Sequence, residues 1–300
     1  MTTRARKKGA TRRLRLGLPK GTLQETTRTM LARAGFDVRF SSRSYFPTID
    51  DPEIECVLIR PQEMARYVAQ GAMDCGIAGH DWIQENRVDV VELADLKAPW
   101  PNYSPIQWVL AVKQGSGFTS IQDLEGKRIA SEAVGLAESY FEAAGVAASS
   151  EFSWGATEVK PPVLADAILD VTDSGASLRS NDLEVLEVVM ESTPRFIANQ
   201  EAAEDPWKRA KMEQLRLLML GAIAAASQVN LSMNVPRARL SKVLELLPAL
   251  NTPTLAPLAD DSWVEVTTVV EERLVREIIV QLADAGARGI IETSLTKIVH

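Results

Sequence analysis

One short stretch of the sequence, residues 158–178, carries residue types suited to binding a sugar phosphate. Carboxylates come first, at Glu158, Asp170 and Asp173, and a turn of small residues follows at 174–178. Carboxylates can hold the hydroxyls of a ribose, while backbone N–H groups and serine hydroxyls beside a glycine can surround a terminal phosphate. The pattern predicts a phosphate cradle, although an ordinary turn uses the same residue types for local reasons.

The apolar residues ahead of this turn predict a short helix. Leu164, Ala167 and Ile168 have the spacing of one buried helical face, and the apolar pattern stops just before Asp170. We therefore expect the carboxylates and hydroxyls to lie at the C-terminal end of an element that a hydrophobic core holds in place.

Cations at the ends of two predicted strands form a second group of candidates. Lys20 and Gly21 follow the apolar strand 14–18, and Arg60 follows the strand 56–59. Ligands of open α/β sheets bind beyond the carboxyl ends of the strands, which is where Arg60 falls. A cation and free N–H groups in a strand-to-helix turn suit an anion, although such turns also occur for geometric reasons alone.

Three further candidates lie nearby in the sequence. Arg43 falls in a polar loop at 41–47, where a solvated surface arginine explains it equally well. Asp74 and Gly79 flank a short predicted strand at 75–78, and Gly79 opens the helix that follows. Arg43 and Arg60 could face a shared cleft.

Several of these segments resemble, in the same order, motifs of the ATP phosphoribosyltransferase family, which opens histidine biosynthesis. The family's Asp-x-x-x-Thr-Gly-x-Thr-Leu loop is matched at 170–178, its Asp-x-Gly-Ile-x-Gly pattern at 74–79 and its Gly-Lys-Arg-Ile-Ala-Thr segment at 126–131. Serine replaces both loop threonines, Leu164 replaces a common glycine, and Thr22 replaces an arginine.

The resemblance implies roles for the candidate residues. Catalysis is assigned to Lys20, Arg60 and Asp170. Phosphoribosyl pyrophosphate is expected to contact Asp170, Asp173, Ser174, Gly175, Ala176, Ser177 and Leu178. ATP is expected to contact Lys20, Gly21, Arg43, Asp74, Gly79 and Glu158. Mg²⁺ is the expected cofactor, and we expect it to arrive with the phosphates and not to occupy a prebuilt metal site.

The implied reaction joins ATP to phosphoribosyl pyrophosphate and releases pyrophosphate. A ring nitrogen of adenine attacks the anomeric carbon, so negative charge grows on the leaving group and positive charge on the sugar. Cationic donors and Mg²⁺ stabilise the leaving group, and Lys20, Arg43 and Arg60 are the candidate donors. Two alternatives stay open: a two-lobed small-ligand-binding protein, and a noncatalytic regulatory relative of the enzyme.

Alternating strands and helices predict an α/β protein, and the resemblance implies a two-lobed, periplasmic-binding-protein-like catalytic region. We expect lobe I at 14–103 and 190–226 and lobe II at 104–189. The proline-rich break at 99–105 is the expected first crossover. Residues 1–13 are basic, lack apolar partners and are predicted to be a disordered tail.

From residue 227 the order of predicted elements becomes βαββαβ, which fits a ferredoxin-like domain over 227–300. In the resembled family's long form, such a domain binds histidine as a feedback inhibitor and supports assembly into dimers or hexamers. The loop containing Leu250, Thr252 and Thr254 matches the family's effector loop, although a plain proline turn has the same composition.

Composition limits the function classes. The 300 residues carry a net charge of −7 with 46% hydrophobic and 24% charged residues, which is ordinary for a soluble globular protein and argues against a general nucleic-acid binder. We find no secretory signal and no membrane-spanning stretch, so we expect a cytoplasmic protein. Cys56 and Cys75 lie in apolar runs and are expected to be buried and reduced; with only two histidines they cannot form a structural zinc site.

Overall fold

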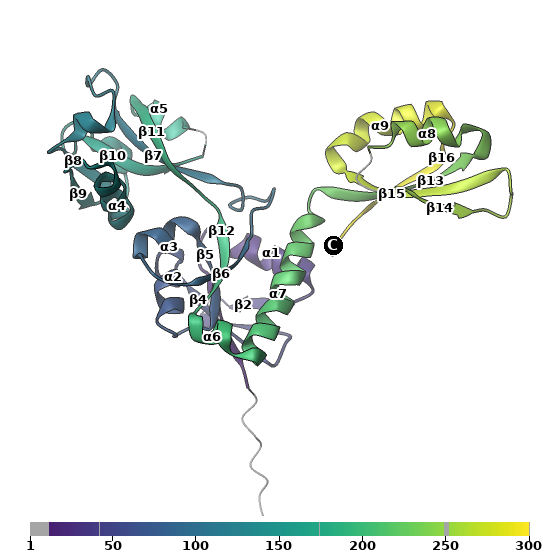
Figure 1. Ribbon diagram of the computed structural model, residues 1–300, viewed down its shortest axis with the longest axis horizontal. Coiled ribbons are helices and arrows are strands. Elements are labelled where there is room, and N and C mark those ends of the chain that lie inside the picture. The colour runs from purple at the N-terminus through teal and green to yellow at the C-terminus, as the bar shows by residue number, and fades with distance from the viewer. Residues whose placement is uncertain (1–11, 42, 174, 249–251, 300) are drawn as a thin grey trace, which may run out of the picture. The chain divides into compact units, whose positions relative to one another are not determined.

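The computed structural model describes residues 12–41, 43–173, 175–248 and 252–299 (Figure 1). The chain divides into a first compact unit that ends at Arg216 and a second that begins at Leu217 and also includes Arg33–Gly35. In the described residues, the first unit holds two five-stranded sheets and the second holds a four-stranded sheet.

The first sheet has the strand order β4-β1-β5-β12-β6. Its strands are β1 (Leu14–Pro19), β4 (Ile54–Ile59), β5 (Cys75–Gly79), β6 (Val91–Asp95) and β12 (Pro194–Ala198). Because β4, β1 and β5 are parallel, their carboxyl ends meet at one edge, whereas β12 is antiparallel to both of its neighbours. The associated helices are α1 (Gln24–Ala34), α2 (Pro61–Ala69), α3 (His80–Asn86), α6 (Gln200–Glu204) and α7 (Pro206–Ala224).

Helix α2 packs closely against this sheet through Met64, which is fully buried. Gly17 of β1 and Gly76 of β5 leave the space for it, since a Cβ atom on Gly17 would lie 2.4 Å from Met64 Sδ. A small residue at each of these two positions is therefore a packing requirement.

The polar segment at 41–47, predicted to be a loop, instead belongs to a two-stranded hairpin of β2 (Val38–Ser41) and β3 (Ser44–Ile49). Both faces of β3 are largely open, so its residues lack the apolar alternation that identifies a half-buried strand. Arg43 lies in the turn of this hairpin.

The second sheet has the strand order β11-β7-β10-β8-β9. Its strands are β7 (Ile106–Lys113), β8 (Arg128–Ser131), β9 (Ser149–Phe152), β10 (Ala167–Thr172) and β11 (Leu183–Ser192). The pairs β10–β8 and β8–β9 are parallel, so these three carboxyl ends also share one edge. The helical segments are η1 (Ile121–Leu124), α4 (Val134–Ala144), η2 (Thr157–Val159) and α5 (Ala176–Ser180).

The prediction of a helix ahead of the phosphate cradle is wrong, because Ala167–Thr172 form the central strand β10 of the second sheet. Ala167, Ile168 and Leu169 are all fully buried, since β7 and β8 flank the strand and both of its faces are covered. A strand buried on both faces loses its period-two alternation and cannot be told from a buried helix by periodicity. Leu164, predicted to share the buried face, lies before the strand and is 59% exposed.

The second unit confirms the ferredoxin-like prediction. Its four antiparallel strands have the order β14-β15-β13-β16, and α8 and α9 lie on one face of the sheet (Figure 1). Strands β13 and β15 alternate buried and less buried residues, as a sheet covered on one side requires. The elements are β13 (Gln228–Pro236), η3 (Arg237–Arg239), α8 (Leu240–Leu246), β14 (Thr254–Pro257), β15 (Trp263–Glu271), α9 (Glu272–Ala285) and β16 (Arg288–Ser294).

Cys56 and Cys75 are buried free thiols, as predicted. Burial raises the pKa of Cys56 to about 12, which keeps the thiol protonated near neutral pH. Among the described residues, no helix has both the length and the apolar character needed to cross a bilayer.

The position of β10 can be tested with two truncations of similar size. Ile168→Ala should lower the free energy of unfolding by about 3 kcal/mol, because it leaves a cavity in a fully buried strand. Leu164→Ala should change it by less than about 0.5 kcal/mol, because that side chain is largely exposed. Urea unfolding of both variants measures the difference, and equal destabilisation would favour the helical interpretation.

Candidate active site

Lys20 and Arg60 lie together at the carboxyl edge of the first sheet. Lys20 follows β1 and Arg60 follows β4, and the Lys20 backbone N–H donates to the Ile59 carbonyl at 2.8 Å. Both residues line one cavity of ≈ 300 Å³ together with Tyr45 and Tyr67. This edge therefore presents two cations to a shared space.

Tyr45 is a component of this edge that the sequence did not identify. Lys20 Nζ donates a hydrogen bond to Tyr45 Oη at 2.8 Å and lies 4.1 Å from the centre of the Tyr45 ring. This hydrogen bond and the positive charges of Lys20 and Arg60 lower the pKa of Tyr45 below its usual value. The hairpin thus holds the Lys20 ammonium in place, while Arg43 in the hairpin turn is exposed.

The second sheet supplies the acidic side of the site. Asp170 lies near the end of β10, and Glu158 in η2 accepts a hydrogen bond from Ser177 Oγ. Burial raises the pKa of Asp170 to about 6; the Val171 N–H opposes this shift, and the charges of Glu158 and Glu132 add to it. Glu158 and Glu132 therefore add to the cost of ionising Asp170 at the start of the loop.

The loop after β10 has the backbone features expected of a tight turn around small groups. Gly175 has a φ of 69° and its N–H donates to Thr172 Oγ1 at 2.8 Å. Leu178 is buried and anchors the loop in the core of the second sheet. Asp173, Ala176 and Ser177 are exposed, and Ser174 lies outside the described residues.

Residues at the carboxyl edges of both sheets line one cavity of ≈ 790 Å³, which forms a cleft between the sheets. Arg60 and Arg66 line it from the first sheet's side, and Glu132 and Trp154 line it from the second. Gln62 Nε2 donates to Glu132 Oε1 at 3.1 Å across the cleft. Within the described ranges, no group of three or more His, Cys, Asp or Glu side chains is placed to hold a metal ion.

A buried carboxylate joins the two chain segments that pass between the sheets. Asp81 in α3 accepts hydrogen bonds from Trp108 Nε1 at 3.0 Å and from Ser192 Oγ at 2.9 Å. Trp108 lies in β7, just after the first passage, and Ser192 ends β11, just before the second. Gly79 is required beside it, because a Cβ atom there would lie 2.1 Å from Asp81 Oδ1.

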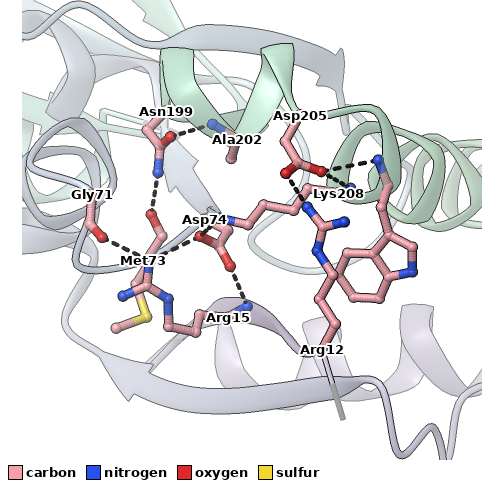
Figure 2. A network of polar contacts seen from close by, with 10 residues as sticks. Arg12, Arg15, Gly71, Met73, Asp74, Asn199, Ala202, Asp205 and Lys208 are labelled. Carbon is pink, nitrogen blue, oxygen red and sulfur yellow. Dashed lines mark hydrogen bonds and ion pairs between the residues drawn. The ribbon is translucent and has the colours of Figure 1, made fainter. Parts of the chain in front are cut away.

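The structure does not bring Asp74 together with the other predicted nucleotide contacts (Figure 2). Asp74 precedes β5, at the opposite edge of the sheet from Lys20 and Arg60. Its Oδ1 accepts hydrogen bonds from Arg15 Nη2 and Lys208 Nζ, both at 2.9 Å, and its Oδ2 accepts one from the Arg15 N–H at 2.8 Å. We therefore assign Asp74 to an ion pair that holds β1 to α7.

The same network continues to Arg12, which the sequence placed in the basic tail. Arg12 donates to Asp205 and lies 4.9 Å from the centre of the Trp207 ring (Figure 2). Asp205 Oδ1 also accepts the backbone N–H groups of Trp207 and Lys208 at 3.0 Å, at the start of α7. The remainder of the predicted tail, residues 1–11, lies outside the described residues.

Comparisons with known proteins identify the family. A model of the family ATP phosphoribosyltransferase matches residues 60–220, and one described as HisG, C-terminal domain, matches residues 225–297. The ATP phosphoribosyltransferase of Chlorobaculum parvum is 52% identical over 286 residues, covering 95% of this chain and 97% of that protein. The chain belongs to the ATP phosphoribosyltransferase family. The match to the C-terminal domain makes it a long-form member.

Other members of the ATP phosphoribosyltransferase family agree with this assignment. The relative from Solibacter usitatus is 52% identical over 95% of this chain and 99% of its own length. Among solved structures, the ATP phosphoribosyl transferase (HisG:HisZ) complex from Thermotoga maritima gives a TM-score of 0.59 at 25% identity, covering 69% of this chain and 98% of that chain. The predicted two-lobed, periplasmic-binding-protein-like catalytic region is confirmed.

Three site residues of this family member escaped the sequence reasoning. Tyr45 and Trp154 lie in polar segments, where motif order gives no signal. Asp81 lies two residues after the Asp-x-Gly-Ile-x-Gly pattern, but nothing in the sequence shows that its partners lie 27 and 111 positions away. Two aromatics close together, Phe152 and Trp154, in the polar segment ahead of Glu158 are the one local signal that could have indicated this site.

The structural role of Asp74 predicts how an Asp74→Asn variant behaves. Burial alone would raise the pKa of Asp74, but the hydrogen bonds from Arg15 and Lys208 outweigh it and lower the pKa. Its stabilising effect is thus present above the ordinary carboxyl pKa and is lost as pH falls through the lowered value. The variant should lose about 3 kcal/mol of unfolding free energy at pH 7.5 and keep the wild-type KM for ATP.

Urea unfolding and steady-state kinetics measure both quantities. Asp37→Asn is the matched control, because Asp37 pairs with Arg39 on an exposed surface and its loss should cost well under about 1 kcal/mol. A raised KM for ATP with unchanged stability would place Asp74 in the nucleotide site after all.

Proposed function

We propose that this chain transfers the phosphoribosyl group of phosphoribosyl pyrophosphate to a ring nitrogen of ATP and releases pyrophosphate, as the first step of L-histidine biosynthesis. Family membership supports this reaction. The observation that carries it is the cleft in which Arg60, a strand-end cation, faces Glu132, which lies beside the acidic loop of the second sheet. A reaction that separates charge between a sugar and a leaving group needs both kinds of side chain in one space.

The second sheet is assigned to the sugar phosphate. Asp170 and Asp173 orient the ribose hydroxyls, and the loop at 174–178 surrounds the 5-phosphate with its N–H groups and hydroxyls. The buried Leu178 supports this role because it fixes the loop on the core. Glu158, which accepts a hydrogen bond from Ser177, is assigned to a contact with the incoming nucleotide.

The first sheet is assigned to the phosphates of ATP and to the departing pyrophosphate. Lys20 and Arg60 stabilise the negative charge that grows as the bond from the anomeric carbon to the pyrophosphate oxygen breaks. Gly21, Arg43 and Gly79 complete the proposed ATP contacts, with Gly79 acting through the space it leaves for Asp81. The attacking ring nitrogen uses its own lone pair, so positioning and electrostatics carry the rate and no general base is assigned.

Mg²⁺ is the proposed cofactor. When bound, it neutralises phosphate charge and makes pyrophosphate a better leaving group. Glu132, an exposed carboxylate on the cleft wall, has the hard oxygen donors that Mg²⁺ prefers, and the substrate phosphates supply the others. These residues fit a metal that arrives with its substrate.

Asp170→Asn tests the sugar-binding assignment. The change is nearly isosteric and should reduce kcat/KM for phosphoribosyl pyrophosphate on the order of 10²-fold, the range for losing one preorganised electrostatic contact. The wild-type kcat/KM should fall as pH drops through about 6, where Asp170 becomes protonated, and the variant should lack this inflection. Measuring kcat/KM for both proteins between pH 5 and pH 8, in steps of about half a pH unit, detects this inflection.

The free energy of unfolding should depend on Asp170 in the opposite direction from kcat/KM. Because the folded-state pKa of Asp170 is raised, ionisation opposes folding, so this carboxyl's contribution to stability is lost as pH rises through about 6. Asp170→Asn should therefore unfold with at least the wild-type free energy at pH 7.5. Asp182→Asn, at an exposed pair with Lys113, is the control and should change neither property; unchanged turnover in Asp170→Asn would remove Asp170 from the site.

Regulation, assembly and location are proposed from the same family membership. Histidine is the proposed feedback inhibitor and binds to the second unit, where Thr252 and Thr254 are exposed. Leu250, the third predicted effector contact, lies outside the described residues. We propose a cytoplasmic homo-oligomer, from dimer to hexamer, with no nucleic-acid or membrane partner.

Pyrophosphate release from ATP, phosphoribosyl pyrophosphate and Mg²⁺, followed with and without histidine, tests the enzyme and its regulation together. Turnover that histidine suppresses is the expected result. A Thr252→Ala, Thr254→Ala double variant should keep full turnover but need about tenfold more histidine for half-inhibition. Thr29→Ala, on the exposed face of α1, is the control. No turnover from folded wild-type protein would favour a binding or noncatalytic regulatory role.

A further inference from the structure

Two aromatic side chains stand exposed at the carboxyl end of β9. The Trp154 side chain is 95% exposed and Phe152 is 48% exposed. Their rings meet edge to face, with centres 4.7 Å apart and planes at 78°. Exposing this much apolar surface is unfavourable in water, so an exposed aromatic pair of this kind marks a binding site more often than it serves the fold.

The backbone under these aromatics is firmly held. Ser153, between them, is fully buried and its N–H donates to the Ser131 carbonyl at 2.8 Å, which continues the sheet. Ser153 Oγ lies 2.8 Å from Thr157 Oγ1 and accepts a hydrogen bond from Lys160 Nζ at 2.6 Å. The two rings are therefore presented on a fixed support, which lowers the entropy lost when a ligand stacks on them.

The position of this aromatic pair matches a specific need of the reaction. Parallel pairing sets Phe152 beside Ser131 of β8, and Ser131 beside Leu169 of β10, so the pair is level with the start of the sugar-phosphate loop. Trp154 lines the same cavity as Arg60 and Arg66. A ring stacked here would share a cavity with the cation Arg60, at the same edge of the second sheet as Asp170.

We propose that Trp154, supported by Phe152, binds the adenine ring of ATP by stacking and positions its ring nitrogen for attack. This inference rests on the reaction proposed above and identifies a nucleotide contact for it. Aromatic side chains stack on nucleobases through their π-faces, and losing one such contact weakens binding by about tenfold. The charged lining of the cavity, with Arg60, Arg66 and Glu132, favours an ionic aromatic ligand over a second copy of the chain, because the cores of protein interfaces are depleted of charge.

Kinetics of Trp154→Ala and Trp154→Phe in the full-length protein test the proposal. Trp154→Ala should raise the KM for ATP by about tenfold and leave the KM for phosphoribosyl pyrophosphate within about twofold of wild type, while Trp154→Phe should recover most of the loss. Trp263→Phe, in the second unit, is the matched control and should change neither constant. An unchanged KM for ATP in Trp154→Ala, with wild-type turnover intact, overturns the inference and leaves the proposed function standing.

Direct binding gives a readout that does not depend on turnover. Titrating ATP without phosphoribosyl pyrophosphate should quench the tryptophan fluorescence of wild type and of Trp263→Phe, and the quench should be largely lost in Trp154→Phe. Absence of wild-type turnover with this pattern intact would reject the reaction but support the stacking contact. If Trp154→Ala binds ATP normally but sediments differently from wild type, the aromatic pair forms a contact between copies of this chain, and the proposal is overturned.

Discussion

The catalytic region depends on the hydrogen bonds that the buried Asp81 carboxylate accepts. The chain passes between the two sheets twice, and Trp108 and Ser192 stand beside those passages. One carboxylate binds both of them from α3, so the two passages and the first sheet's edge are fixed to each other. The Gln62–Glu132 hydrogen bond is a second link between the two sheets, and Gly79 is the residue that leaves room for the Asp81 carboxylate.

The site built around this junction separates charge by sheet. Parallel strands end in Lys20 and Arg60 on one side, and in the surroundings of Asp170 and Glu132 on the other. Burial and the neighbouring Glu158 and Glu132 raise the pKa of Asp170 to about 6, whereas Tyr45 accepts a hydrogen bond from the Lys20 ammonium. A substrate that carries both a sugar and phosphates suits both sides, because its hydroxyls can donate to the carboxylates and its phosphates can accept from the cations.

Much of this architecture could be predicted from the sequence. Strand-end cations, the βαββαβ order and the motif series were all readable locally, since turns, caps and alternation leave local signals. Strand β10 was not, because burial on both faces removes the periodicity that separates a strand from a helix. Asp74 was misplaced for a related reason: the motif gives its position along the chain, but only the pairing with Arg15 and Lys208 shows which edge of the sheet it occupies.

The strand order of the first sheet also determines when each part of the protein can be completed during synthesis. Strand β6 pairs only with β12 among the described strands, and β5 needs the same partner, so this sheet stays unfinished until residue 198 has left the ribosome. The second sheet is built entirely from residues 106–192. The central part of the chain can therefore fold before the part that precedes it, which reverses the usual amino-terminal-first order of cotranslational folding.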